Sequence, residues 1–217
     1  KPRKIHVIDN SEYVLSIIRR NLINKFKGYN FKLLEIKKFN SFNNYVKQNK
    51  IDYIFHSAAF KHVDILEENI EPAIQNNIFG TLNVLKSAAN NKSNITIIST
   101  DKAVKPINVL GFTKRISEIL CNLFLNKGID IKIVRFGNVI GSRGSAIPLF
   151  IKQLNNKEPV TLSSYNARRY FMTIKEACYL VIECTKIKNK ENLFILNMGK
   201  EIKILDLIKN LGNIYKS

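Results

Sequence analysis

Residues 99–106 place three chemically distinct side chains next to one another: the hydroxyl of Thr100, the carboxylate of Asp101 and the ammonium group of Lys102. They follow residues 94–98, a short apolar and β-branched run that predicts a buried strand. Ligands of open α/β sheets bind beyond the carboxyl ends of the strands, and proton transfer needs an acid and a base near one substrate. The segment therefore predicts a proton-transfer site. An ordinary Asp–Lys pair in a polar loop is the alternative that the local sequence leaves open.

Strand-like and helix-like segments alternate along most of the chain. Strands are predicted at 4–8, 31–36, 53–55, 95–99 and 131–134, and helices at 12–26, 42–48 and about 72–89. A further helix is predicted to carry Ile116, Ile119, Leu120, Leu123 and Phe124 on one face. Repeated β-α units of this kind predict an α/β fold with a parallel, doubly wound sheet.

Beyond about residue 141 this rhythm changes. Pro148, Pro159 and the polar loop 163–166 interrupt short elements, and they are followed by a predicted helix near 174–185, a strand near 194–197 and a helix near 204–211. We therefore expect a doubly wound domain at 1–141 and a smaller, mixed lobe at 142–217.

The turn that opens a dinucleotide-binding sheet is absent from the sequence. Such a sheet starts with a strand, a Gly-rich turn and a helix whose N-terminus binds the pyrophosphate, and the chain has no G-x-G-x-x-G. Its first predicted strand ends at Asp9, and an acidic residue at the end of the second strand normally binds the adenosine ribose. We infer that the chain begins one β-α unit late. Capping of the following helix by Asp9, Asn10 or Ser11 is the alternative.

Composition limits the classes of function. With 217 residues, 45% of them hydrophobic, the chain is long enough to bury a full core. A net charge of +18 favours an anionic substrate, but the basic residues are scattered rather than clustered, so we expect no nucleic-acid partner. No apolar run approaches the ~20 residues that cross a bilayer. Cys121, Cys178 and Cys184 lack metal-ligand spacing, so we expect reduced cysteines, no metal site and a cytoplasmic location.

Six segments, in order and at family spacing, resemble the polysaccharide-biosynthesis branch of the extended short-chain dehydrogenases. These are nucleotide-sugar 4,6-dehydratases that act on UDP-N-acetylglucosamine. The segments are VIDNSEY (7–13), HSAAFKHV (56–63), NNIFGT (76–81), STDKAV (99–104), RFGNVIGSRGS (135–145) and RYFMT (169–173). The resemblance implies that 1–141 is an NAD(P)-binding Rossmann-type domain without its first unit, and that 142–217 is a substrate-binding lobe. Residues 210–217 end on no recognisable cap, which is what a chain that stops mid-domain would show.

The resemblance also implies a lyase reaction in three steps. Bound NAD(P)+ takes a hydride from C4 of the sugar and gives a 4-ketone. The ketone acidifies the C5 proton, a base removes that proton, and the C6 hydroxyl leaves as water with help from an acid. The hydride then returns to C6, which yields a UDP-4-keto-6-deoxy-hexosamine for capsule, O-antigen or glycoprotein sugars.

By the same resemblance, Asp101 is the acid for the departing C6 hydroxyl and Lys102 is the base at C5. Thr100 would form a hydrogen bond near the 4-hydroxyl, and Lys114 would hold the nicotinamide ribose. This chemistry requires that the pKa of the lysine be lowered by burial or a neighbouring cation, and that the pKa of the aspartate be raised.

Binding residues follow from the same motifs. The expected cofactor site comprises Asp9, Ala58, Ala59, Asn77 and Lys114, and the expected substrate site comprises Lys61, His62, Asn138, Arg143 and Arg169. The two arginines can make bidentate contacts with diphosphate oxygens; a surface or interdomain salt bridge is the alternative for each. Between NAD and NADP, Asp9 favours NAD because its carboxylate would repel a 2′-phosphate.

Two positions depart from the family pattern. Leu110 stands where short-chain dehydrogenases usually have a Tyr, four residues before Lys114. A leucine exchanges no proton, so deprotonation of O4 would fall on Thr100, Asp101 or the ribose network; membrane-bound members of the family often have Met there. Phe112 replaces a usual Ala, and it either crowds the site or packs outward.

Two other functions stay open. A nucleotide-sugar epimerase usually needs the missing Tyr, and the Asp101–Lys102 pair argues against it because epimerases eliminate no water. A non-catalytic fragment that keeps the fold is favoured by Leu110 and the absent Gly-rich turn, and it is opposed by the intact proton-transfer residues. We expect a homo-oligomer. Anchoring at the cytoplasmic face of the inner membrane depends on sequence upstream of Lys1, because full-length relatives often carry N-terminal transmembrane helices.

Overall fold

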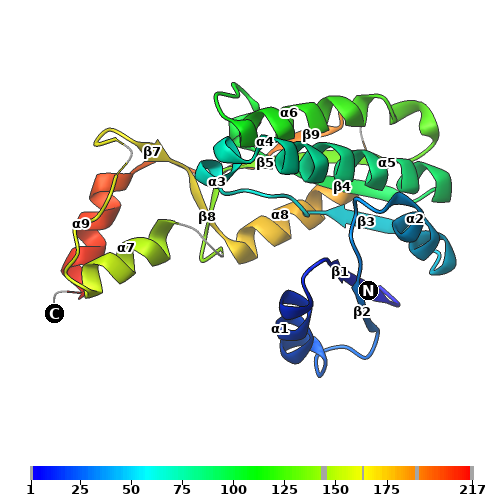
Figure 1. The fold of residues 1–217 in the computed structure, drawn as a ribbon, viewed down its shortest axis with the longest axis horizontal. Coiled ribbons are helices and arrows are strands. Elements are labelled where there is room, and N and C mark those ends of the chain that lie inside the picture. The colour runs from blue at the N-terminus through cyan, green and yellow to red at the C-terminus, as the bar shows by residue number, and fades with distance from the viewer. Residues whose placement is uncertain (1, 143–145, 163, 189–190, 216–217) are drawn as a thin grey trace. The chain divides into compact units, whose positions relative to one another are not determined.

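The computed structural model describes residues 2–142, 146–162, 164–188 and 191–215 (Figure 1). The strands are β1 (Ile5–Asp9), β2 (Tyr29–Leu33), β3 (Tyr53–His56), β4 (Asn94–Thr100), β5 (Ile131–Phe136), β6 (Asn138–Ile140), β7 (Arg168–Arg169), β8 (Phe171–Thr173), β9 (Leu193–Ile195) and β10 (Ile202–Lys203). The α-helices are α1 (Glu12–Leu22), α2 (Phe39–Gln48), α3 (Val63–Glu68), α4 (Ile70–Ala73), α5 (Gly80–Asn91), α6 (Val109–Asn122), α7 (Ala146–Asn155), α8 (Ile174–Lys186) and α9 (Ile204–Tyr215). A π-helix, η1 (Ile74–Phe79), joins α4 to α5, and the short 3-10 helices are η2 (Asp101–Ala103) and η3 (Leu125–Lys127).

The chain forms two compact units. Unit 1 comprises Lys1–Ile95 and Asn108–Ile131, and unit 2 comprises Thr96–Ile107 and Lys132–Ser217. Strands β4 and β5 each begin in unit 1 and end in unit 2. The loop that follows β4 therefore belongs to unit 2, whereas α6 belongs to unit 1.

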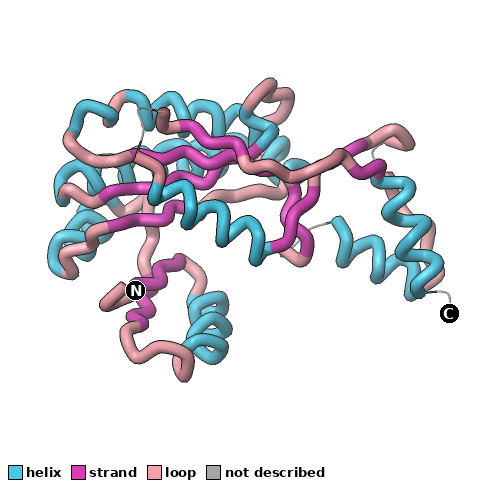
Figure 2. The backbone as a smooth tube through the Cα atoms, turned by 180° about the vertical axis from the view of Figure 1, so that it is seen from behind, coloured by secondary structure: helices cyan, strands magenta, loops and turns pink. Residues whose placement is uncertain are grey.

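Strand pairing confirms the predicted α/β class with a parallel, Rossmann-like sheet. Four strands lie side by side in the order β3-β4-β5-β9 (Figure 2). Within it, β5 and β9 pair in parallel, with Ile133 opposite Leu193. Strands β1 and β2 form a separate parallel pair, as do β6 and β8, whereas β7 and β10 pair antiparallel.

Helix packing organises unit 1. Helix α5 lies between α2 and α6 and packs on both (Figure 1). The face of α2 that carries Phe42 and Val46 is buried, because these apolar residues recur at helical spacing. The Nδ1 atom of His6 on β1 lies 2.8 Å from the hydroxyl of Tyr45 on α2, which ties the first strand to this layer.

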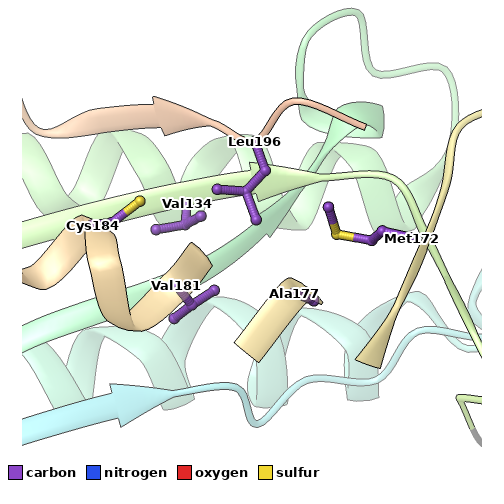
Figure 3. Packing of buried hydrophobic residues seen from close by; sticks show 6 residues of the cluster. All are labelled: Val134, Met172, Ala177, Val181, Cys184 and Leu196. Carbon is purple, nitrogen blue, oxygen red and sulfur yellow. The ribbon is translucent and has the colours of Figure 1, made fainter. Parts of the chain in front are cut away.

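The core of unit 2 is an apolar cluster around α8. It comprises Val134, Met172, Ala177, Val181, Cys184 and Leu196 (Figure 3). These residues come from β5, β8, α8 and the segment after β9. The α8 residues lie at positions 177, 181 and 184, and this spacing of four and three residues puts them on one face of the helix.

Several element boundaries differ from the prediction. The strand expected at 31–36 is β2 at 29–33, and the helix expected to reach residue 26 ends at Leu22. The helix expected at about 72–89 divides into α4, η1 and α5. Helix α7 was not predicted because Pro148 argued against it, yet Pro148 lies in the first turn, where a missing N–H breaks no helical bond.

A buried lysine on β5 supplies one testable stabilising interaction in unit 2. The ammonium group of Lys132 donates a hydrogen bond to the carbonyl of Ile187 (2.7 Å), just past the end of α8, and lies 5.4 Å from the ring centre of Phe194. A cation at a helix C-terminus is favourable. Lys132→Met should therefore lower the free energy of unfolding by about 1–3 kcal/mol, as measured by urea denaturation.

Lys186→Met is the matched control. Lys186 is an exposed lysine at the end of the same helix, paired with Glu183, and exposed pairs contribute little. We expect no measurable shift in its urea midpoint. Equal shifts in the two variants would contradict a specific role for Lys132.

Candidate active site

The Asp101 carboxylate is the centre of a small polar cluster in unit 2. Its Oδ1 atom accepts hydrogen bonds from the hydroxyl of Thr100 (2.8 Å) and from the ammonium group of Lys102 (3.2 Å). Thr100 is extended and caps η2, and its Oγ1 also accepts from the Lys102 N–H. Among the described residues, the second oxygen of Asp101 has no hydrogen-bond partner. The carboxylate can therefore contact a ligand while its neighbours hold it in place.

Asp101 also lines a cavity of about 330 Å³ in unit 2. The other lining residues are Val104, Arg135, Phe136, Tyr170, Ile195, Leu196, Asn197, Met198 and Gly199. Most of them are apolar. All but Val104, which follows η2, and Tyr170, between β7 and β8, come from the ends of β5 and β9 or from the segment that follows β9. This position agrees with the rule that ligands bind beyond the carboxyl ends of parallel strands.

Asn138 lies beside the wall of this cavity. Its backbone N–H donates to the carbonyl of Tyr170 (3.0 Å), and the residue pairs with Phe171 in the β6-β8 ladder. The preceding Gly137 permits this close crossing, because a Cβ there would lie 3.2 Å from the Tyr170 carbonyl oxygen. The structure thus places the predicted Asn138 near the same cavity as Asp101.

In unit 1, the π-helix carries the buried Asn77. Its backbone carbonyl accepts hydrogen bonds from the hydroxyls of Thr81 (2.6 Å) and Ser117 (2.9 Å). Its side-chain amide donates to Thr113 (3.1 Å) and exchanges two bonds with the backbone of Phe60 (2.8 and 3.0 Å). One residue therefore joins the loop after β3 to α5 and α6. Single π-turns of this kind are frequent at functional sites.

Lys114 on α6 is buried in unit 1. Burial lowers the pKa of its ammonium group to about 8, against opposing contributions from Cys121 and Glu118. In the part of the chain that the structure describes, this ammonium group makes no hydrogen bond or ion pair. Because a buried amine without a partner costs free energy, Lys114 is suited to hold a polar group of a ligand.

His56 ends β3 and is buried beside the same network. Its Nε2 lies 2.9 Å from the hydroxyl of Thr81, which already donates its proton to the Asn77 carbonyl. The hydroxyl must therefore accept from His56, which assigns the proton to Nε2. Burial, and then the charge of Lys114, lower the pKa of His56 to about 3. The ring is neutral at physiological pH and acts here as a hydrogen-bond donor.

Among the described residues, the remaining predicted ones make no hydrogen bond to Asp101 or to Asn77. Asp9 accepts a hydrogen bond from the Ser11 N–H (2.8 Å), and Ser11 itself caps α1. Ala58, Ala59, Lys61 and His62 lie in the loop between β3 and α3, where both lysine and histidine are exposed. Arg169 on β7 is exposed and donates to the Arg168 carbonyl (2.7 Å). Arg143 lies outside the described residues.

The two departures from the family pattern have different surroundings. Leu110 is buried in an apolar cluster with Leu66 and Ala73, so it serves as a packing residue of unit 1. Phe112 is exposed on α6. Of the two expected outcomes for Phe112, the structure shows the outward one.

Several residues of these groups were not predicted from the sequence. They are Thr81, Thr113 and Ser117 in the Asn77 network and Arg135, Asn197 and Met198 at the cavity. The Asn77 network could have been found from the sequence. Thr81 follows Asn77 by one helical turn, and Ser117 follows Thr113 by the same interval, so each pair shares a helix face. Tyr170 also lines the cavity.

The described residues contain neither a metal-ligand cluster nor a helix that could span a membrane. No cluster of three or more His, Cys, Asp or Glu side chains there has the geometry of a metal site. Nor do these residues include a helix that is both long enough and apolar enough to span a bilayer.

This chain is similar to several curated proteins. The probable polysaccharide biosynthesis protein EpsC of Bacillus subtilis is 38% identical over 216 residues, which cover 97% of this chain and 36% of EpsC. The capsular polysaccharide biosynthesis protein CapD of Staphylococcus aureus is 48% identical over 161 residues, covering 73% of this chain and 27% of CapD. A UDP-glucose 4-epimerase of Rickettsia bellii is 35% identical over 170 residues, covering 76% and 49%. The chain thus spans half or less of the length of each relative.

A solved structure and a family model extend the similarity to the whole chain. The X-ray structure of Pen from Bacillus thuringiensis matches with a TM-score of 0.92 and 33% identity, over 100% of this chain and 69% of Pen. The model of the family described as polysaccharide biosynthesis protein matches residues 1–217. This chain therefore belongs to the polysaccharide biosynthesis protein family.

Proposed function

We propose that the protein is a nucleotide-sugar-modifying enzyme of surface-polysaccharide synthesis, and specifically an NAD-dependent UDP-N-acetylglucosamine 4,6-dehydratase. One observation carries this proposal: Asp101, held by Thr100 and Lys102, lines a cavity at the carboxyl ends of parallel strands. The similarity to EpsC and CapD supports a role in polysaccharide synthesis. We further propose that residues 1–141 bind the cofactor and that 142–217 bind the sugar nucleotide.

The acid and the base would act as one pair in the elimination step. Asp101 would donate a proton to the C6 oxygen while Lys102 takes the C5 proton. The C6–O bond then breaks, water leaves, and a C5–C6 double bond forms. The step begins with a proton on Asp101 and a neutral Lys102, and it ends with a carboxylate beside an ammonium group. The short distance between Lys102 Nζ and Asp101 Oδ1, 3.2 Å, suits such a pair.

The residues of unit 1 fit a nicotinamide dinucleotide. The buried ammonium group of Lys114 suits a ribose hydroxyl, and Asn77 anchors the loop that carries Ala58 and Ala59. When bound, the cofactor would supply the acceptor and later the donor of one hydride. Leu110 offers no proton, so Thr100 is the residue we assign to the 4-hydroxyl.

The test uses protein expressed with any coding sequence that precedes Lys1. It is incubated with UDP-N-acetylglucosamine and NAD+, and the products are examined by mass spectrometry. A product lighter by one water supports the dehydratase. A product of unchanged mass in which the configuration at C4 is inverted would show that the protein is an epimerase instead. The Rickettsia relative is named as such an enzyme. If both ligands bind and no product forms, the protein is a non-catalytic member of the family.

The cavity beside Asp101 supports a substrate with an acylamino group. Its walls are largely apolar, and Asn197 is one of its few polar residues. The Asn197 Oδ1 accepts from the Gly199 N–H (3.0 Å), while its amide NH2 has no partner in the described parts of the chain. An apolar wall beside the Asn197 amide donor suits the methyl group and carbonyl of an N-acetyl substituent.

Asn197→Asp removes that donor and keeps the acceptor for Gly199. It should raise KM for UDP-N-acetylglucosamine about 10-fold, the effect of one lost hydrogen bond, and leave KM for UDP-glucose unchanged. Asn197→Ala, which also frees the Gly199 N–H, should affect both substrates. If Asn197→Asp shifts KM equally for both sugars, the acyl group does not bind here.

A further inference from the structure

Met198 brings a sulfur atom to the wall of the cavity beside Asp101. Its thioether accepts a hydrogen bond from the backbone N–H of Gly137, with 2.7 Å between nitrogen and sulfur. The two residues are closely packed, because a Cβ on Gly137 would lie 3.1 Å from that sulfur. A leucine would fill a similar volume but would leave the Gly137 N–H without its acceptor. Met198 therefore makes a polar contact as well as an apolar one.

The contact with Gly137 leaves one side of the sulfur open to reaction. A thioether sulfur has two lone pairs, and one of them accepts the Gly137 N–H. Met198 is only partly buried and lines a cavity of about 330 Å³, so a small hydroperoxide can reach the other lone pair. Such oxidants convert thioethers to sulfoxides. Because the sulfur of a sulfoxide is chiral, oxygen that adds to a single lone pair gives a single epimer.

Most other sulfur atoms of the chain are protected from a hydroperoxide. Met172, the second of the two methionines, is 4% exposed in the core of unit 2 (Figure 3). Cys121 and Cys184 are also buried. Burial raises the pKa of the Cys121 thiol to about 12 and also raises the pKa of Cys184, and the oxidation of a cysteine proceeds through its thiolate. Cys178, which is exposed, is the competing sulfur.

We propose that Met198 is an oxidative modification site, at which a hydroperoxide converts the thioether to a single epimer of the sulfoxide. The sulfur lone pair attacks the terminal peroxide oxygen, the O–O bond breaks and an S–O bond forms. The leaving oxygen takes up the proton of the transferred oxygen. The sulfur loses two electrons, and the hydroperoxide is reduced to water or an alcohol.

The effect of this modification on substrate binding rests on the proposed function. A sulfoxide oxygen is a strong hydrogen-bond acceptor, whereas a thioether is a weak one. The amide of the adjacent Asn197 lies in the wall of the same cavity, so the new oxygen competes with the acyl carbonyl of the substrate for that donor. Affinity for UDP-N-acetylglucosamine should fall about 10-fold, the effect of one lost hydrogen bond. Affinity for UDP-glucose, which has no acyl group, should fall less.

Peptide mass spectrometry on the full chain tests the site. In a Cys178→Ser background, which removes the exposed thiol, hydrogen peroxide should add one oxygen atom to the Met198 peptide well before it adds one to the Met172 peptide. The peptides are then treated with the two types of methionine sulfoxide reductase, each of which is specific for one epimer. One type alone should restore the Met198 peptide when the folded protein was oxidised. Each type should restore about half of it when the protein was oxidised in urea.

Calorimetric titration with UDP-N-acetylglucosamine before and after oxidation tests the effect on the ligand. Met172→Leu should keep the loss of affinity, whereas Met198→Leu should abolish that loss whatever its own starting affinity. Equal oxidation of the two methionines, two epimers from the folded protein, or an oxidised protein of unchanged affinity would each overturn the proposal. If the untreated protein does not bind the sugar nucleotide, the proposed function fails, and the reductase assay still decides whether Met198 is oxidised on one side.

Discussion

Asp101→Asn should lower the rate of water loss from UDP-N-acetylglucosamine by about 10²–10⁴-fold, the contribution of a positioned general acid. Asparagine has the same shape and can still accept from Thr100 and Lys102, which now bond to Oδ1 of Asp101. It has no proton acidic enough to give to the departing hydroxyl. The measurement is the initial rate of the product that is lighter by one water.

The base should continue to act in this variant. In heavy water, Lys102 would still remove the C5 proton, so deuterium should appear at C5 of recovered sugar while water loss stops. Asp64→Asn, which removes the same charge from the first turn of α3, is the control and should retain the wild-type rate. A wild-type rate for Asp101→Asn would show that another group is the acid.

Acidification should destabilise the protein well above the range in which carboxylates titrate. His56 has a folded-state pKa of about 3 against an ordinary value of 6.5. Between these two values, the unfolded chain binds a proton that the folded chain does not, so the free energy of unfolding falls as the pH falls. Below pH 6.5 the loss attributable to His56 approaches about 1.4 kcal/mol per pH unit. Urea midpoints measured from pH 7 to pH 5 report this slope.

His56→Gln separates titration from packing. Glutamine can replace the hydrogen bond to Thr81 but does not titrate, so the variant should lose most of the slope whatever its stability at pH 7. His6, whose pKa is also lowered by burial and by Lys4, should contribute a smaller part that His6→Gln removes. Identical slopes in the wild type and His56→Gln would show that His56 is protonated in the folded protein.

The parts of the fold that follow from short apolar runs could be predicted from the sequence. Strands such as β4 and β5 are rich in apolar and β-branched residues, which made them recognisable. Asp101 and Lys102 directly follow β4 in the sequence, so their position at the end of this strand does not depend on the rest of the fold. Adjacent residues stay adjacent in any fold, which is why the proposed proton-transfer pair could be picked out from the sequence. The motifs of the family added Asn77 and Lys114.

What depended on long-range packing could not be predicted. The apolar face of α6 would ordinarily be placed inward, yet the buried face is polar because Thr113 and Ser117 bind Asn77. No local pattern distinguishes η1 from an ordinary helix, since its π-turn is held by those distant hydroxyls. The cavity residues Tyr170 and Asn197 follow Asp101 by 69 and 96 positions in the sequence, so no local pattern links them to it.

The π-turn at η1 constrains how the gene for this protein can change. A π-helix is an α-helix that holds one additional residue, and successive residues of a helix are rotated by about 100°. Losing one codon anywhere in 74–79 would restore a regular helix and turn Asn77 away from Thr113 and Ser117. The length of the segment is therefore constrained as well as its sequence, and a frame-preserving deletion here should be as damaging as the loss of Asn77 itself.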